Sequence, residues 1–270
     1  MINVGISSYN VRAHVPSDVP THNQVISSAN LKSQSQLKAI NEWTQEKKMK
    51  LNIRKTKNLI FNFSKKYQFT TKLNVEKENI EMVRETTLLG TVITDRLTWD
   101  RNTEELVKKG YKRMRLLSTA AAFTNNRKEL KDIYLTFIRS ILEQSAVVWH
   151  SSLSVKNKSD LERVQKAAVR VIMGNNYSSY KNGLKDLKLD TLEKRRDFLC
   201  LKFAKNCLNN EKMKALFPLN KTKHHMKKRK VFKFQLKKIK TKRWNRSALP
   251  HMTRLLNDEN ERKNKILKNS

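Results

Sequence analysis

The sequence predicts an α+β fold that is predominantly helical, with a small antiparallel β portion before a helical bundle and a basic tail. Three observations predict this class. Helix-interrupting residues are rare, since the chain has 5 Gly and 4 Pro in 270 residues. Short β-branched runs bounded by polar residues fall between residues 58 and 94. After Trp99 the apolar residues recur at helical spacing.

The first elements are predicted from caps and alternation. Residues 1–30 contain two prolines and many serines and asparagines, which predicts irregular structure. Ser33 and Gln36 have the spacing of a capping box, so a helix is expected from Ser33 to about Lys48. Leu37 then lies on its apolar face.

Strands are expected at residues 58–63, 70–75 and 79–83. The last two flank a short polar stretch, which predicts a hairpin. Residues 86–94 predict a further strand, in which Gly90 is expected to mark a close approach of another backbone.

Four helices are expected after Trp99, with apolar stripes that form the core of a bundle. The features that define them are, in order, Asn102 with Glu105, the apolar positions from Leu130 to Ile141, Ser159 with Glu162, and Asp190 with Glu193. The predicted organisation therefore has four parts: an irregular start (1–30), a small β portion (31–98), a helical bundle (99–212) and a basic tail (213–270).

Positive charge dominates the composition. Lys and Arg number 58 against 24 Asp and Glu, giving a net charge of +34. Such a charge favours a polyanionic partner, RNA or DNA, through release of counterions. A membrane surface is the other polyanion, but no lipid-binding helix pattern and no apolar run of about 20 residues is present. The first residues lack the pattern of a signal peptide, so an intracellular chain is expected.

The tail is the most basic part of the chain. Lys212 to Asn257 contains no Asp or Glu, and Lys221 to Arg246 interleaves cations with Phe232, Phe234 and Trp244. Cations neutralise phosphates and aromatic rings stack on unpaired bases, so largely sequence-independent binding of RNA and DNA is expected. The alternative is a solvated basic segment without a defined ligand. The candidate nucleic-acid-binding residues are Lys227, Lys228, Arg229, Lys230, Lys237, Lys238, Arg243 and Trp244. The run from Lys227 to Lys230 also fits a nuclear-import motif.

Catalytic and metal-binding motifs are missing. The chain has no Asp-Asp pair, phosphate-binding loop, zinc-protease motif or nucleophile elbow. Cys200 and Cys207 are separated from each other and from His224 and His225 by gaps that do not match a zinc knuckle. Two core cysteines and a solvated histidine pair are expected instead, and neither a metal site nor a cofactor is predicted.

The order of the motifs resembles the C-terminal part of a non-LTR (LINE-type) retrotransposon reverse transcriptase. Asn52, Lys55 and Thr56 match an N-x-x-K-T segment that precedes a strand in that family. A strand called the primer grip follows there. It is matched by Leu88, Leu89 and Gly90, and Leu97 with Trp99 matches the L-x-W entry into a helical thumb. Residues 138–154, 160–172 and 184–208 resemble later helices, so the resemblance covers roughly residues 1 to 220.

The resemblance implies a function, but the sequence lacks one motif on which that function depends in the family. The family's aromatic-x-Asp-Asp loop should precede this segment, but the sequence does not contain it. This implies a 5′-truncated remnant of an RNA-directed DNA polymerase, not an enzyme on its own, that retains template-primer-binding surface. Mg²⁺ is expected only for the full-length enzyme, and with the palm restored Lys55 would be the general acid toward pyrophosphate. Two alternatives stay open: a free-standing basic RNA- or DNA-binding protein derived from such an element, and a relic without function. A solvated charge before a strand is the plain alternative for Lys55.

Overall fold

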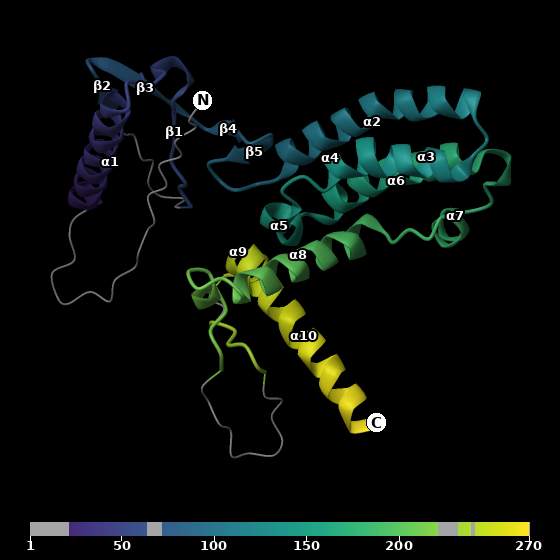
Figure 1. The fold of residues 1–270 in the computed structure, drawn as a ribbon. Coiled ribbons are helices and arrows are strands. Elements are labelled where there is room, and N and C mark those ends of the chain that lie inside the picture. Colours follow the sequence, from purple (N-terminus) through teal and green to yellow (C-terminus); the bar gives the residue numbers. More distant parts are fainter. Residues whose placement is uncertain (1–21, 64–71, 221–231, 239–240, 270) are drawn as a thin grey trace. The chain divides into compact units, whose positions relative to one another are not determined.

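The computed structural model describes residues 22–63, 72–220, 232–238 and 241–269 (Figure 1). The chain divides into two compact units, Met1–Thr98 and Trp99–Ser270. Helix accounts for 64% and strand for 10%, so the predicted, predominantly helical α+β class is confirmed. None of the helices within the described ranges is long and apolar enough to cross a membrane.

The first unit packs one helix on a small sheet. The helix is α1 (His22–Glu46). The sheet has the order β1-β3-β2, with β1 parallel and β2 antiparallel to β3. Its strands are β1 (Lys57–Leu59), β2 (Leu73–Val75) and β3 (Glu78–Val83). Leu37 of α1 meets the buried face of the sheet in a core completed by Leu73, Val75 and Ile80.

The start of α1 corrects two predictions. The helix begins at His22, so Ser33 lies inside it and is not its cap. The irregular structure expected up to residue 30 is wrong for 22–30, while residues 1–21 lie outside the described part. Serine and asparagine have only moderately unfavourable helix propensities, which is why a polar composition did not exclude helix there.

Two hairpins follow, and only one was predicted. Glu76 and Lys77 have φ of 48° and 72° and join β2 to β3, which confirms the first hairpin. The single strand expected at 86–94 is wrong, because it is β4 (Glu85–Leu88) paired antiparallel with β5 (Thr91–Thr94). Gly90 sits in their two-residue turn with φ of 80°, so it lies in a turn and not inside a strand. The strand expected at 58–63 is also shorter, ending at Leu59.

The second unit is a helical bundle built around α2 (Asp100–Phe123) and α6 (Val155–Met173), which lie side by side (Figure 1). Gly110 permits this approach, since a Cβ there would lie 3.0 Å from Cγ1 of Val164. The chain leaves α2 into α3 (Arg127–Ile133), passes through a π-helical turn (Tyr134–Arg139) and continues into α4 (Ser140–Leu142).

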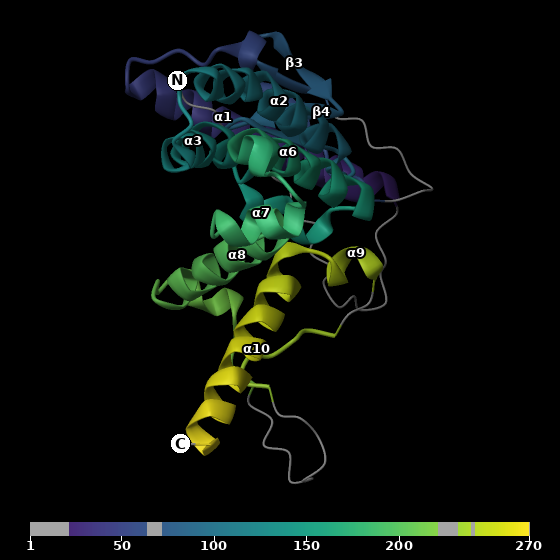
Figure 2. The ribbon, with the colours of Figure 1, turned by 90° about the vertical axis from the view of Figure 1, so that its right-hand side faces the viewer.

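A second core joins the end of the chain to this bundle. The other elements are α5 (Ala146–Trp149), η3 (His150–Ser152), α7 (Tyr180–Asp186), α8 (Leu192–Leu208), α9 (Lys242–Asn245) and α10 (Ala248–Asn269). Figure 2 shows the N-terminal part of α10 against α8. Its core consists of Cys200, Ala204, Cys207, Phe217, Phe234, Met252 and Leu256. The predicted tail therefore contains a helix and core residues.

The predicted caps of the bundle helices are displaced. Asn102 is buried inside α2, and the N-cap position of this helix is Trp99. α6 is capped by Ser154, whose hydroxyl accepts from Asn157 N at 3.1 Å, and Ser159 lies within the helix. Thr191, one residue after the predicted Asp190, caps α8. A capping pair can recur by chance inside a helix, and the sequence does not show which of several neighbouring polar residues is the cap.

Candidate nucleic-acid interface

The outward face of α2 is the clearest candidate interface. Lys108, Lys112 and Arg115 are exposed and lie opposite the stripe of buried residues that includes Leu106 and Met114. At a rise of 1.5 Å per residue, the three cations span about 10 Å along the helix. They form a row of positive charge on a rigid element.

Glu104 and Glu105 precede this row on α2, but no carboxylate of the described residues pairs with its cations. Leu106 to Lys128 contains no Asp or Glu, and none of the three cations forms an ion pair within the described ranges. Arg101, near the start of α2, is by contrast paired with Glu104 at 2.9 Å. Unpaired cations on one face attract phosphates and release their counterions.

Two neighbours of the row have different roles. Tyr111 is 44% exposed and offers an aromatic ring beside the cations. Arg113 instead donates from Nη1 to the carbonyl of Phe137 at 3.0 Å, so it joins α2 to the π-helical turn. We define the α2 basic face as Lys108, Lys112, Arg115 and Tyr111. Sequence reasoning missed it, although the acid-free run from 106 to 128 was visible.

The tail residues are placed in part. Lys237 and Lys238 are exposed, and Arg243 and Trp244 lie in α9, where Trp244 is 36% exposed. Lys227, Lys228, Arg229 and Lys230 lie outside the described residues. The stacking role suggested for Phe234 is wrong, because Phe234 is buried in the second core and its N–H donates to Asn257 Oδ1 at 2.9 Å.

Lys55 ends a short 3-10 helix, η1 (Ile53–Lys55), that the N-x-x-K-T spacing itself builds. Asn52 caps it, because its Oδ1 accepts from Lys55 N at 3.1 Å and its carbonyl accepts from Thr56 Oγ1 at 2.9 Å. The Lys55 side chain is exposed. Lys57, two residues on, forms an ion pair with Glu81 across β1 and β3, so its charge is engaged within the sheet.

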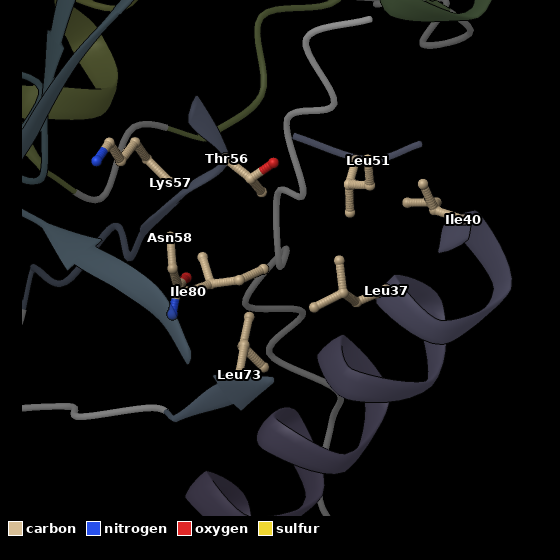
Figure 3. A pocket seen from close by; sticks show the side chains of 8 residues that line it. All are labelled: Leu37, Ile40, Leu51, Thr56, Lys57, Asn58, Leu73 and Ile80. Carbon is tan, nitrogen blue, oxygen red and sulfur yellow. The ribbon is translucent and has the colours of Figure 1, made fainter. Parts of the chain in front are cut away.

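A cavity lies next to this turn (Figure 3). Thr56, Lys57 and Asn58 line it together with apolar side chains of α1 and the sheet, Leu37 among them. Its volume of about 20 Å³ holds little more than one water molecule, far less than a nucleotide. The cavity is therefore a packing gap between helix and sheet and not a nucleotide site.

Leu88, Leu89 and Gly90 form the tip of the β4–β5 hairpin instead of a strand interior. Leu89 is 79% exposed and has φ of 48°, in the left-handed region. That conformation costs an L-residue about 1 kcal/mol. The hairpin therefore presents an apolar side chain at its tip.

One group of potential metal ligands is present among the described residues, namely His150, Asp197 and His251. Both histidine Nε2 atoms contact the same Asp197 Oδ1, at 3.0 and 2.9 Å. His150 Nδ1, however, faces the donor Nε of Arg196 at 3.1 Å. A metal-bound histidine normally donates from its second nitrogen, so this arrangement suits a hydrogen-bonded cluster and not a metal site.

The cysteines behave as predicted core residues. Cys200 and Cys207 are 1% and 2% exposed and belong to the second core. Burial raises the pKa of the Cys200 thiol to about 12, so it stays protonated and unreactive at neutral pH. His224 and His225 lie outside the described residues.

No protein-family model, curated protein or solved structure matches the chain. The functional argument therefore depends on the residues and geometry above.

Proposed function

We propose that this chain is a nucleic-acid-binding remnant of a non-LTR retrotransposon reverse transcriptase, which binds template-primer but does not polymerise alone. The observation that carries the proposal is the α2 basic face, an acid-free row of exposed cations on the first helix after the β portion. In the family that the sequence resembles, this position begins the thumb.

Two local features agree with this proposal. Asn52 caps the turn that ends at Lys55, which gives a physical reason for the N-x-x-K-T spacing. The tip of the β4–β5 hairpin exposes Leu89, which the resemblance assigns to the primer grip. Two-metal nucleotidyl transfer needs converging carboxylates, and among the described residues the one cluster of potential ligands contains a single carboxylate.

The test measures binding and synthesis with the same protein. Fluorescence anisotropy with labelled single-stranded RNA, single-stranded DNA and a primed RNA template should show affinity with little sequence preference. The affinity should fall steeply as salt rises from about 50 to 200 mM, as phosphate contacts require. Mg²⁺-dependent extension of the primer should not exceed a control without protein.

Two outcomes would contradict the proposal. Affinity that is independent of salt would exclude phosphate contacts as its basis. Primer extension that survives removal of contaminating polymerases would show a complete active site.

A further inference from the structure

Three elements far apart in sequence meet at one buried polar cluster. His150 of η3, Arg196 and Asp197 of α8, and His251 of α10 are its members, and we call it the histidine cluster. Arg196 is fully buried and His150 is 2% exposed. The two imidazole rings pack edge to face, with centroids 5.7 Å apart.

The hydrogen bonds fix where the protons lie. Arg196 Nε can only donate, so His150 Nδ1 accepts from it at 3.1 Å. The single proton of a neutral His150 is then on Nε2, which donates to Asp197 Oδ1 at 3.0 Å. His251 Nε2 donates to the same oxygen at 2.9 Å. Asp197 thereby connects η3, α8 and α10.

The buried guanidinium depends on this arrangement. Its Nη1 and Nη2 are buried without a hydrogen-bond partner among the described residues, so the bond from Nε to His150 is the one it makes there. It also lies over the ring of Trp149, with a centroid distance of 5.7 Å.

We propose that the histidine cluster is an acid-sensitive clasp, which holds the N-terminal half of α10 on α8 at neutral pH and opens when His150 is protonated. A second proton on His150 must occupy Nδ1. It would then face the N–H of Arg196, and guanidinium cannot lose a proton to relieve the conflict. The bond breaks, and two cations then lie side by side, with Asp197 as the one carboxylate hydrogen-bonded to the cluster.

The charged and titratable groups that face His150 come from α8 and α10. They are Arg196, Asp197 and His251, whereas α5, which also packs against η3, carries none. Burial lowers the pKa of His150, the Arg196 charge lowers it further, and the hydrogen bond to Asp197 opposes both. Burial alone would raise the pKa of Asp197, but the bonds from both histidines outweigh it and hold the carboxylate ionised.

The direction of the pH effect follows from this shift. The ordinary pKa of histidine is about 6.5, and in the closed clasp that of His150 is lower. The closed state therefore has its full stability above pH 6.5 and loses it as the pH falls below that value, because the open state takes up the proton. One pH unit below, opening should rise by up to about 10-fold, the limit being reached when the closed state takes up no proton.

The test is hydrogen exchange of the α10 amides in the full chain at pH 7.5 and 5.5, corrected for intrinsic exchange rates, with α2 as internal reference. The expected result is an increase in opening of α10, by up to about 10-fold, and no change in α2. In His150→Gln, the amide oxygen can accept from Arg196 and the amide nitrogen can donate to Asp197, so the clasp should stay closed and the pH response should disappear. His251→Gln is the matched control and should retain the pH response of α10.

Several results would overturn the clasp. One such result is that opening of α10 in the wild type does not change between pH 7.5 and 5.5. Another is that the pH response disappears in His251→Gln but persists in His150→Gln. Nitrogen-15 NMR of the wild-type imidazoles checks the premise without any variant. A neutral His150 protonated on Nε2 supports the clasp, and one protonated on Nδ1 contradicts it.

Discussion

Replacing the three cations of the α2 basic face tests the interface most directly. The variant is Lys108→Gln, Lys112→Gln and Arg115→Gln together. All three side chains are exposed and outside ion pairs of the described residues, and glutamine has nearly the helix propensity of lysine and arginine. The fold should therefore be retained, which circular dichroism and thermal unfolding can check.

The expected loss follows from counterion release. For single strands, each phosphate contact contributes about 0.7 to the slope of log affinity against log salt. If each cation contacts one phosphate, the slope should fall by about 2, and affinity at about 0.1 M salt by about 100-fold. Fluorescence anisotropy across a salt series with labelled single-stranded RNA measures both quantities.

A matched control removes the same charge elsewhere. Lys181, Lys185 and Lys188 are also exposed, but Asp186 and Asp190 lie beside them in the sequence. Their replacement by glutamine should change the slope by much less than the α2 variant does. Equal losses in both variants would mean that affinity reflects net charge alone, and the α2 basic face would lose its assigned role.

Two further predictions concern the first unit. Leu89→Asn should raise the thermal midpoint, because asparagine tolerates the left-handed region, and the gain should be about 1 kcal/mol. An unchanged or lower midpoint would contradict the strain assigned to Leu89. In a fusion of this chain behind the palm of a non-LTR reverse transcriptase, Lys55→Ala should slow single-turnover incorporation about 10²-fold, and Lys57→Ala much less, because Lys57 is engaged with Glu81. Equal effects of the two substitutions would exclude a general-acid role for Lys55.

The fold class was predictable because periodicity reports burial. The positions around Leu106, Leu161 and Leu37 were expected on apolar faces, and all three are buried. The ends of the helices were less predictable, because they depend on which of several neighbouring polar residues caps the helix. The turn at Leu89 was missed for a related reason, since leucine rarely adopts positive φ and the run around it is otherwise β-branched.

The features that depend on tertiary contact were not predictable. His150, Asp197 and His251 are distant in sequence, and only the packing of η3, α8 and α10 brings them together. The helix α10 was not predicted, because the strongly basic segment before it led the whole region to be assigned to a tail. Its apolar residues Met252 and Leu256 have helical spacing, and Pro250 lies in its first turn, where a missing N–H costs little.

The packing of α10 also decides how the tail can be studied. Removing residues 221–270 deletes the basic tail, but it also removes Phe234, Met252 and Leu256 from the second core. Cys200 and Ala204 would then be exposed on α8, and lost affinity would report unfolding as readily as lost contacts. Substitutions at exposed tail positions such as Lys237 and Lys238 leave that core intact. Comparing their salt slopes with that of the α2 variant therefore divides the phosphate contacts between tail and helix, which no truncation can do.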